Sequence, residues 1–303
     1  MKTVIDRAAL SDPALTGIGR QHLGDLVVEL AGAWTDQREG RLHDRRGGRR
    51  ERRAGAGRKY ELVFCDRVLL TLIYLRLDLP QRVLAVLFGV RQSTIARAIG
   101  EIRPLLAGRG FAAPDRPGVR LRTLADVLAY AAAEGVTLRL DATETQVNRP
   151  SAGKPGRKAF VSGKKRLNTI KTTVISDGRG RTLWCGAFRP GRQHDQTAIQ
   201  TEGIDALLDH YPRARALVDA GYRGLRKRHK RQVIAPPPGS PKQDNDIRAR
   251  ARTRQSSHRI PVENAIGRHK QWRGLRRWTH HRHTLAESYT AVASLVSDRD
   301  ATR

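Results

Sequence analysis

The chain has 303 residues, and its 58 Lys and Arg against 29 Asp and Glu give a formal net charge of +29 at pH 7. Roughly 100–200 residues make a domain, so the length allows two, and a hydrophobic content of 39% excludes wholesale disorder. No apolar run approaches the ~20 residues of a membrane span, and the N-terminus lacks a signal-peptide core, so we expect a cytoplasmic protein. The net charge predicts binding to a polyanion, most often nucleic acid.

Residues 1–57 are predicted to form an N-terminal helix followed by an Arg-rich arm. Apolar side chains recur on one helical face at Leu23, Leu26, Val27 and Leu30. Residues 38–59 are rich in Arg and Gly and have no periodic apolar face, so we expect a flexible basic linker there. Two interpretations of this arm stay open, a solvated spacer and a contact to DNA phosphates.

Residues 58–106 are predicted to form a helix-turn-helix domain. A short helix is expected to begin at Pro80 and to bury Val83 and Leu84, with a turn at Gly89 after it. The next helix is expected to end at Pro104. Polar and basic side chains gather at the start of that last helix, so we expect it to be the recognition helix. The side chains expected to reach base edges and phosphates are Arg91, Gln92, Ser93, Thr94 and Arg97. An ordinary three-helix bundle is the alternative, and the net charge favours DNA binding.

Residues 107–135 are predicted to be a connector whose one short helix ends at Gly135, and residues 136–298 a mixed α/β domain. An Asp-Gly pair between two β-prone runs predicts a hairpin. The expected strands are residues 136–147, 168–177, 181–190 and 216–220; the expected helices are residues 194–212, 259–275 and 283–296; and a loop is expected over residues 225–257. The fold class is therefore α/β (mixed), preceded by an all-α domain.

Three acidic residues of this domain lie at the ends of predicted strands or in a predicted helix. Asp141 ends the apolar stretch of the first strand, Asp219 ends the fourth strand, and Glu263 lies in a helix. If they converge, three carboxylates bind two hard divalent cations such as Mg²⁺, which serve phosphodiester chemistry. Spacing alone leaves their convergence open.

The stretch from about residue 58 to residue 280 resembles bacterial insertion-sequence transposases of the IS5 type, in the DDE superfamily. The segments that carry the resemblance occur in the family's order and are LRLDLPQRVLAVLFGVRQSTIARAI, LDATETQVNRP, FVSGKKRLNTIKT, GRQHDQTA, VDAGYRG and RIPVENAIGRHKQWRGLRR. The resemblance implies a ribonuclease-H-like catalytic domain, two Mg²⁺ or Mn²⁺ ions per active site, and movement of an element bounded by inverted repeats.

The resemblance assigns the catalytic, metal-holding carboxylates to Asp141 in LDATE, Asp219 in VDAGYRG and Glu263 in PVENAIG. The family's third-acid signature is Tyr, two residues, Arg, three residues, Glu, six residues, Lys. Its Arg and Lys match Arg259 and Lys270, which would then contact substrate phosphates.

One position departs from that signature, because Ser256 stands where the family has Tyr. The departure matters little to metal binding but puts any role of a tyrosine in doubt. Upstream, the basic SGKKR segment is expected to grip the DNA backbone through Lys164 and Lys165.

Other acids have structural interpretations. Strand alternation places Glu144 on the opposite face from Asp141, as a supporting or surface residue. Asp177 belongs to the Asp-Gly turn, and Asp195 is expected to cap a helix. Asp244 and Asp246 are expected to be solvated in the loop.

Aromatic residues, histidines and cysteines near these motifs are also assigned structural places. Trp272 and Trp278 are expected to pack in the core rather than stack on bases. The histidines His280, His281 and His283 are expected to be basic surface rather than a zinc site. The two cysteines are 120 positions apart, which excludes a disulfide framework, and Cys65 and Cys185 are expected to be small core residues.

These observations predict a DNA transposase that binds double-stranded element ends, cleaves the phosphodiester at the element boundary and joins the 3′-hydroxyl to target DNA. Two ends must meet, so we expect a homodimer on DNA, with no membrane partner, at the bacterial nucleoid. One alternative is a non-catalytic DNA-binding regulator or a domesticated transposase. Another is a ribonuclease-H-like nuclease without joining activity, such as a junction resolvase.

Overall fold

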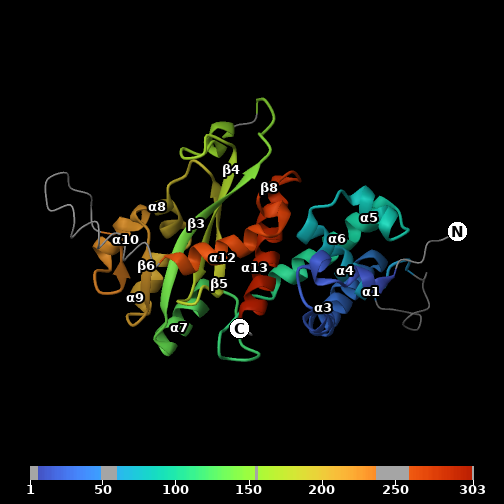
Figure 1. Cartoon of the computed structure of the whole chain (residues 1–303), viewed down its shortest axis with the longest axis horizontal. Helices are drawn as coiled ribbons and strands as arrows, with labels where there is room; N and C mark the ends of the chain where they lie inside the picture. Colours follow the sequence, from blue (N-terminus) through green and yellow to red (C-terminus); the bar gives the residue numbers. More distant parts are fainter. Residues whose placement is uncertain (1–5, 49–59, 154–155, 237–258, 302–303) are drawn as a thin grey trace. The chain divides into compact units, whose positions relative to one another are not determined.

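A computed structural model describes residues 6–48, 60–153, 156–236 and 259–301. The chain divides into two compact units (Figure 1). Unit 1 consists of Met1–Gly108 together with Trp272–Gly274, and unit 2 consists of Arg109–Gln271 and Leu275–Arg303. Within the described ranges unit 1 is helical, and all strands belong to unit 2.

The N-terminal part of unit 1 is more helical than expected. Two short helices, α1 (Arg7–Leu10) and α2 (Pro13–Thr16), precede the long α3 (Arg20–Arg46). Helix α3 buries Leu26 and Leu30, as predicted. It then continues through the first half of the segment expected to be a flexible arm, so that expectation is wrong for residues 38–46.

One pair within the helix and one contact to another helix help to explain why α3 continues without an apolar face. Arg41 donates hydrogen bonds to Gln37 Oε1 at 2.8 Å and to Glu101 Oε1 at 3.4 Å. Arg, Glu and Leu are also good helix formers. The helix ends at Gly47, whose φ of 71° suits a left-handed C-cap that only glycine adopts at little cost. The second half of the predicted arm, residues 49–59, lies outside the described residues.

The predicted helix-turn-helix is present in unit 1. Helix α4 (Phe64–Leu77) is followed by α5 (Gln81–Leu87) and α6 (Gln92–Gly108). The last two are bent by 105° at the turn that contains Gly89, within the range of helix-turn-helix pairs. The predicted inner face of α6 is confirmed, since Ile95, Ile99 and Ile102 are buried.

Two details of these helices differ from expectation. In α5 only Leu84 is buried, and Val83 is exposed because the short helix turns that side away from the core. Helix α6 continues past Pro104 to Gly108 rather than ending there. Proline removes one backbone hydrogen bond inside a helix, and the full burial of Ile102 and Leu106 on either side offsets that loss.

Unit 2 is built on a six-stranded sheet in which the strands follow the order β5-β4-β3-β6-β7, with β8 (Arg277–Trp278) paired to the end of β3. Strand β3 (Thr137–Val147) runs antiparallel to β4 (Thr169–Ser176), which runs antiparallel to β5 (Thr182–Pro190). On its other side β3 is parallel to β6 (Arg215–Val218), and β6 is parallel to β7 (Val233–Ile234). Three consecutive antiparallel strands, extended on one side by two parallel strands, form the ribonuclease-H-like arrangement. The mixed α/β class is confirmed.

Helices cover this sheet, and a smaller ribbon lies beside it. The ribbon pairs β1 (Phe111–Ala112) with β2 (Arg120–Leu121), and the predicted connector helix is α7 (Leu124–Glu134), which ends at Gly135 as expected. Helix α12 (Ile260–Lys270) packs on β3 and β4, and α13 (Leu285–Ala301) packs on β5 (Figure 1). Leu285, Tyr289 and Val292 of α13 are fully buried, so this helix contributes to the core of unit 2.

Between the parallel strands, two segments differ from expectation. The helical run near residue 200 is broken at Gly203 into α8 (Asp195–Thr201) and α9 (Ile204–His210). The expected loop after residue 225 begins with α10 (Arg223–Arg228) and includes β7. Leu225 and Val233 are buried in it, which a run rich in Pro and Arg does not reveal from sequence. Residues 237–258, with Asp244, Asp246 and Ser256, lie outside the described residues.

Among the described residues, no single helix is long and apolar enough to cross a membrane.

Candidate active site

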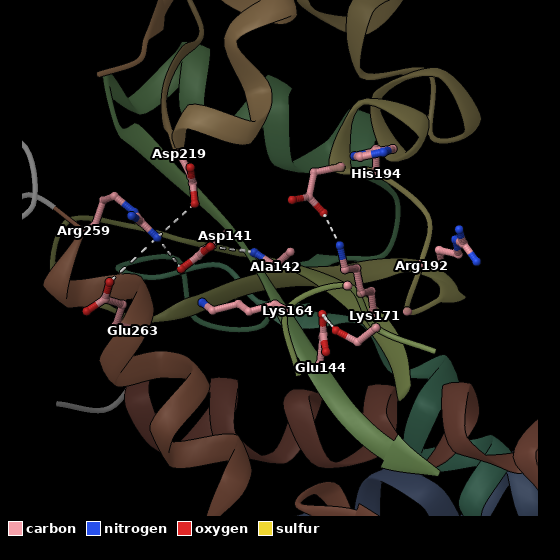
Figure 2. Close-up of a pocket in the computed structure, with 14 residues that line it drawn as sticks. Asp141, Ala142, Glu144, Lys164, Lys171, Arg192, His194, Asp219, Arg259 and Glu263 are labelled. Atoms are coloured by element: carbon pink, nitrogen blue, oxygen red, sulfur yellow. Dashed lines mark hydrogen bonds and ion pairs between the residues drawn. The ribbon is translucent and has the colours of Figure 1, made fainter. Parts of the chain in front are cut away.

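The three predicted acids line one pocket of unit 2. Asp141 lies in β3, and Asp219 directly follows β6. Because Leu140 pairs with Val218 in the parallel register, the next residue on each strand is an acid and the two lie side by side. Glu263 stands in the first turn of α12, which packs against β3. The pocket has a volume of about 450 Å³, and Figure 2 shows the three carboxylates on one side of it.

The guanidinium of Arg259 lies between these carboxylates. Its Nη2 is 2.8 Å from Asp141 Oδ2, 3.6 Å from Asp219 Oδ2 and 3.7 Å from Glu263 Oε1. Arg259 immediately precedes α12, so one turn of helix carries both this cation and the third acid. Four charged groups from three segments distant in sequence therefore meet at one point (Figure 2).

Burial and charge act in opposite directions on Asp141. Its side chain is 13% exposed, whereas those of Asp219 and Glu263 are 35% and 52% exposed. Burial raises the pKa of Asp141, and the neighbouring Arg259 lowers it by less, so the net shift is upward. The pKa of Arg259 is raised, because the attraction of the acids outweighs the effect of its burial. The site therefore opens to solvent on the side of Glu263.

Glu144 lines the same pocket as Asp141, contrary to the expectation from strand alternation. Residues 138 and 140 of β3 are buried, and after Asp141 the buried positions become 143, 145 and 147. The pattern of burial thus changes phase at Asp141 and Ala142, although β3 pairs with β4 in an unbroken register from Arg139 to Gln146. Its carboxylate accepts hydrogen bonds from Ser162 at 3.0 Å and Thr169 at 3.1 Å. A change of phase within a strand leaves no sequence signal.

Asp195 is a second acid whose place the sequence did not reveal. The N-cap of α8 is His194, and Asp195 makes no capping bond, so the capping interpretation is wrong. Instead Asp195 Oδ1 accepts a hydrogen bond from the buried Arg189 at 2.6 Å and lies 3.6 Å from Lys171 Nζ. This cluster forms part of the pocket wall. Its only sequence signal is the segment GRQHDQTA, which sequence reasoning assigned to a helix start.

The segment that follows Asp219 packs closely against this wall. A Cβ on Gly221 would lie 3.0 Å from Asp195 Oδ2, and one on Gly224 would lie 2.7 Å from Gln196 Oε1. Gln196 also donates a hydrogen bond to the Gly221 carbonyl at 3.1 Å. The glycines of VDAGYRG thus allow the close approach that holds the turn carrying Asp219.

Lys164 and Lys165 are exposed on the loop between β3 and β4, and Lys164 reaches the pocket (Figure 2). Arg192 and His194, from the turn between β5 and α8, line another part of it and are also exposed. Basic side chains therefore surround the acids. Contact of Lys164 and Lys165 with DNA stays a prediction.

Lys270 makes its polar contacts within the protein itself. Its ammonium donates hydrogen bonds to the Glu144 carbonyl at 2.9 Å, to Thr145 Oγ1 at 3.0 Å and to the Leu275 carbonyl at 2.5 Å. An ammonium has three donors, so these acceptors use all of them. Burial lowers the pKa of Lys270 to about 7. In this structure Lys270 joins α12 to β3, and its contact with substrate phosphate stays a prediction.

The predicted DNA-reading side chains surround the start of α6 in unit 1. Arg91, Gln92, Ser93 and Arg97 are exposed, and Thr94 is half-buried. They lie opposite the buried isoleucine face, where a recognition helix presents its contacts. Their contact with DNA stays a prediction.

Several structural expectations are confirmed in the described residues. Trp272 and Trp278 are buried. Asp177 accepts hydrogen bonds from the backbone N–H groups of Arg179 and Arg181 within its turn. Cys185 is buried, whereas Cys65 is exposed, so the core assignment of Cys65 is wrong. Helix α4 turns Cys65 outward because it buries the neighbouring Asp66, which accepts a hydrogen bond from the Val63 N–H and pairs with Arg7.

The donor set of the pocket fits a hard divalent cation. Carboxylate oxygens are the ligands that Mg²⁺ and Mn²⁺ prefer, and three converge here. Among the described residues, however, no three His, Cys, Asp or Glu side chains are already grouped closely enough to hold an ion. The guanidinium of Arg259 occupies the space between the three carboxylates. The Arg259 side chain must therefore move before the carboxylates can bind a cation there.

Comparisons with known proteins agree with this architecture. The family model described as DDE superfamily endonuclease matches residues 140–297, and that described as the helix-turn-helix of DDE superfamily endonuclease matches residues 60–112. The chain is 27% identical over 177 residues to the probable transposase for insertion sequence element IS702 of Microchaete diplosiphon. That alignment covers 57% of this chain and 58% of the relative, less than two thirds of its length.

Among solved structures, a pre-cleavage Mos1 transpososome matches with 14% identity, over 81% of this chain and 82% of that chain. Its TM-score is 0.21, too low for the match to support an argument. The family matches carry more weight, because the first spans more than half of the chain and includes all three acids. The chain therefore belongs to the DDE superfamily endonucleases and carries the helix-turn-helix of that superfamily.

Proposed function

We propose that this protein is a DNA transposase that cuts at the ends of an insertion sequence and joins them to target DNA. The observation that carries the proposal is the convergence of Asp141, Asp219 and Glu263 in one pocket ringed by basic side chains. Assignment to the IS5 type and the catalytic roles of the three acids belong to the same proposal. The curated relative's name, that of a probable insertion-sequence transposase, supports it.

The helix-turn-helix would recognise the element ends. The exposed side chains at the start of α6 are of the types that bond base edges and phosphates. Lys164 and Lys165 would hold the backbone of the strand that enters the pocket. A net charge of +29 favours association with DNA and makes it sensitive to salt.

Asp141, Asp219 and Glu263 would hold two Mg²⁺ or Mn²⁺ ions, which supply Lewis-acid stabilisation to phosphodiester chemistry when bound. In the first reaction a water oxygen attacks phosphorus and the bond to the 3′ oxygen breaks, which leaves a 3′-hydroxyl and a 5′-phosphate. In the second, that 3′ oxygen attacks a target phosphorus and the target's own 3′ oxygen leaves. The tie between Lys270 and β3 positions α12, and with it Glu263, beside Asp141 throughout.

Two element ends have to be cut and joined together, so we expect a homodimer on DNA. The three acids of the pocket all come from one chain, so dimerisation would serve to pair ends rather than to assemble the acids.

The test uses a DNA fragment that carries the gene's own flanks, with Mg²⁺, and compares wild type with Asp141→Ala. We expect metal-dependent cleavage at the flanks and a joined product from wild type, and binding without cleavage from the variant. Cleavage without joined product would support a nuclease instead. Binding without cleavage by wild type would support a regulator, and unchanged cleavage by Asp219→Ala would overturn the assignment of the site.

A further inference from the structure

The position of Arg259 raises a question that the family signature leaves open. A side chain expected to bind substrate phosphate instead contacts all three acids, with its Nη2 between 2.8 and 3.7 Å from an oxygen of each. A guanidinium and a divalent cation are both attracted by this set of carboxylates. Mg²⁺ needs oxygen ligands at about 2.0–2.1 Å. A cation bonded to these oxygens of the three acids would occupy the space now taken by Arg259 Nη2.

Arg259, whose side chain is 22% exposed, makes few hydrogen bonds for an arginine. Among the described residues it makes one side-chain hydrogen bond, to Asp141, and its other two contacts are longer ion pairs. Arg189, at the opposite wall, donates to Thr173, to the Ala187 carbonyl and to Asp195. A guanidinium has five N–H donors, so most of those on Arg259 are left without an acceptor in the described part of the chain. Arg259 can therefore move at much lower cost than Arg189.

We propose, resting on the function proposed above, that Arg259 is an internal counterion that competes with the divalent cation for Asp141, Asp219 and Glu263. Without the metal its guanidinium neutralises the three carboxylates and prevents their mutual repulsion. When metal binds, Arg259 leaves the acids and its charge becomes available at the pocket for a substrate phosphate. The same side chain thus stabilises the free protein and contacts DNA only in the metal-bound state.

The competition has a measurable size. The apparent dissociation constant of a ligand equals its intrinsic value divided by the fraction of protein competent to bind. If Arg259 occupies the acids in about nine molecules of ten, its removal tightens metal binding about tenfold. If Arg259 only neutralised distant charge, its removal would change the affinity for metal much less. If Arg259 helped to bind the metal, its removal would weaken metal binding.

The first experiment is calorimetric titration of the full chain with Mn²⁺ alone, without DNA. We expect Arg259→Gln to bind Mn²⁺ about tenfold or more tightly than wild type, and Arg259→Lys to stay closer to wild type because it keeps the charge. Arg192→Gln is the matched control, since it removes the same charge from an exposed arginine of the same pocket. We expect it to change the dissociation constant by less than about twofold.

Thermal unfolding gives a second readout on the same proteins. A ligand that binds only the native state raises stability in proportion to the logarithm of its concentration over its dissociation constant. Saturating Mn²⁺ should therefore raise the Tm of Arg259→Gln by more than that of wild type. Without metal the Arg259→Gln protein should melt at a lower temperature, because its three carboxylates lose their counterion.

A third measurement needs only wild type, in case Arg259→Gln does not fold. An arginine-specific dicarbonyl reagent followed by mass spectrometry reports how freely each guanidinium reacts. We expect Mn²⁺ to increase the rate of modification of Arg259 several-fold and to leave Arg192 unchanged. Equal or weaker Mn²⁺ binding by Arg259→Gln, or an unchanged rate at Arg259 while Mn²⁺ binds, overturns the counterion proposal alone. Absence of Mn²⁺ binding to both wild type and Arg259→Gln overturns the metal-dependent function as well.

Discussion

The two ends of α12 hold their charges in different ways. At the N-terminal end, Arg259 and Glu263 meet at 3.7 Å over a pocket open to solvent, and Glu263 has no closer ion pair among the described side chains. At the C-terminal end, Lys270 has three acceptors, and the buried His269 contacts Thr182 Oγ1 at 3.0 Å and Tyr289 Oη at 3.1 Å. One end of the helix is therefore fixed to the sheet, while the other presents charges that can exchange partners. Substitutions at the pocket end should therefore affect cleavage, whereas substitutions at the anchored end should affect the free energy of unfolding.

The largest expected effect is at the pocket end. Glu263→Gln removes the charge of a proposed metal ligand without changing the shape of the side chain. Even residues that only support metal ligands matter 10–100-fold. We expect cleavage of flank DNA to fall by at least about 100-fold. The free energy of unfolding should change by less than about 1 kcal/mol, because the side chain is exposed. A loss of stability large enough to explain the lost cleavage would mean that Glu263 helps to hold the fold, as Lys270 does at the other end of α12.

His269 should dominate the acid sensitivity of the anchored end. Burial and nearby cations lower its pKa from 6.5 to about 3. Between those values the unfolded chain binds a proton that the folded chain does not, so stability falls as the pH drops through this window. We expect a loss of about 2 kcal/mol between about pH 6 and pH 4.5 from this group.

Urea unfolding at several pH values measures that loss. His269→Gln keeps a polar side chain at the site but cannot titrate, so its stability should depend less on pH than that of wild type. Equal pH dependence of the two proteins would show that other groups account for the acid sensitivity.

Lys270→Met should separate the structural role of Lys270 from its expected contact with phosphate. The substitution removes three donors and leaves the Glu144 and Leu275 carbonyls without this partner. We expect a loss of about 2–3 kcal/mol in the free energy of unfolding, measured by urea denaturation. The slope of DNA affinity against salt should stay the same, whereas loss of a phosphate contact would reduce it by about one unit.

The smallest effect is expected at the pocket rim. Arg192→Ala removes an exposed side chain that lines the pocket without contacting the three acids. We expect the free energy of unfolding to stay within about 0.5 kcal/mol of wild type, as is usual for surface substitutions. A larger destabilisation would mean that the rim, like the C-terminal end of α12, is part of the anchor.

Much of the architecture followed from local patterns. The isoleucine face of α6, the Asp-Gly hairpin between β4 and β5, and the C-cap at Gly135 depend on periodicity and turn chemistry that neighbouring residues provide. The order of these elements was enough to predict a mixed α/β domain. The spacing of the three acids left their convergence open, and the resemblance to the DDE superfamily assigned them to one site.

The site's partners depended on contacts between distant segments. The burial pattern of β3 changes phase at Asp141, and Glu144 lines the pocket together with it. Asp195 meets Arg189 across the turn from β5 to α8. The continuation of α3 to Arg46 depends in part on Glu101, which belongs to another helix. Arg41 and Glu101 are 60 positions apart, whereas Arg189 and Asp195 are only six apart and meet because the chain turns back between β5 and α8. Neither contact follows from the periodicity of a single helix or strand.

By itself the sequence determined which residues carry charge, which runs become helices and strands, and which three acids are candidates for one site. Only the tertiary structure decided what each charged side chain faces. The signature residues Arg259 and Lys270 differ in this respect, since the first lies among the acids at 2.8 Å from Asp141 and the second is enclosed by carbonyl and hydroxyl oxygens. The physical reason is that the environment of a charge depends on the packing of β3, β6 and α12 together, whereas the identity of the charge depends on one residue.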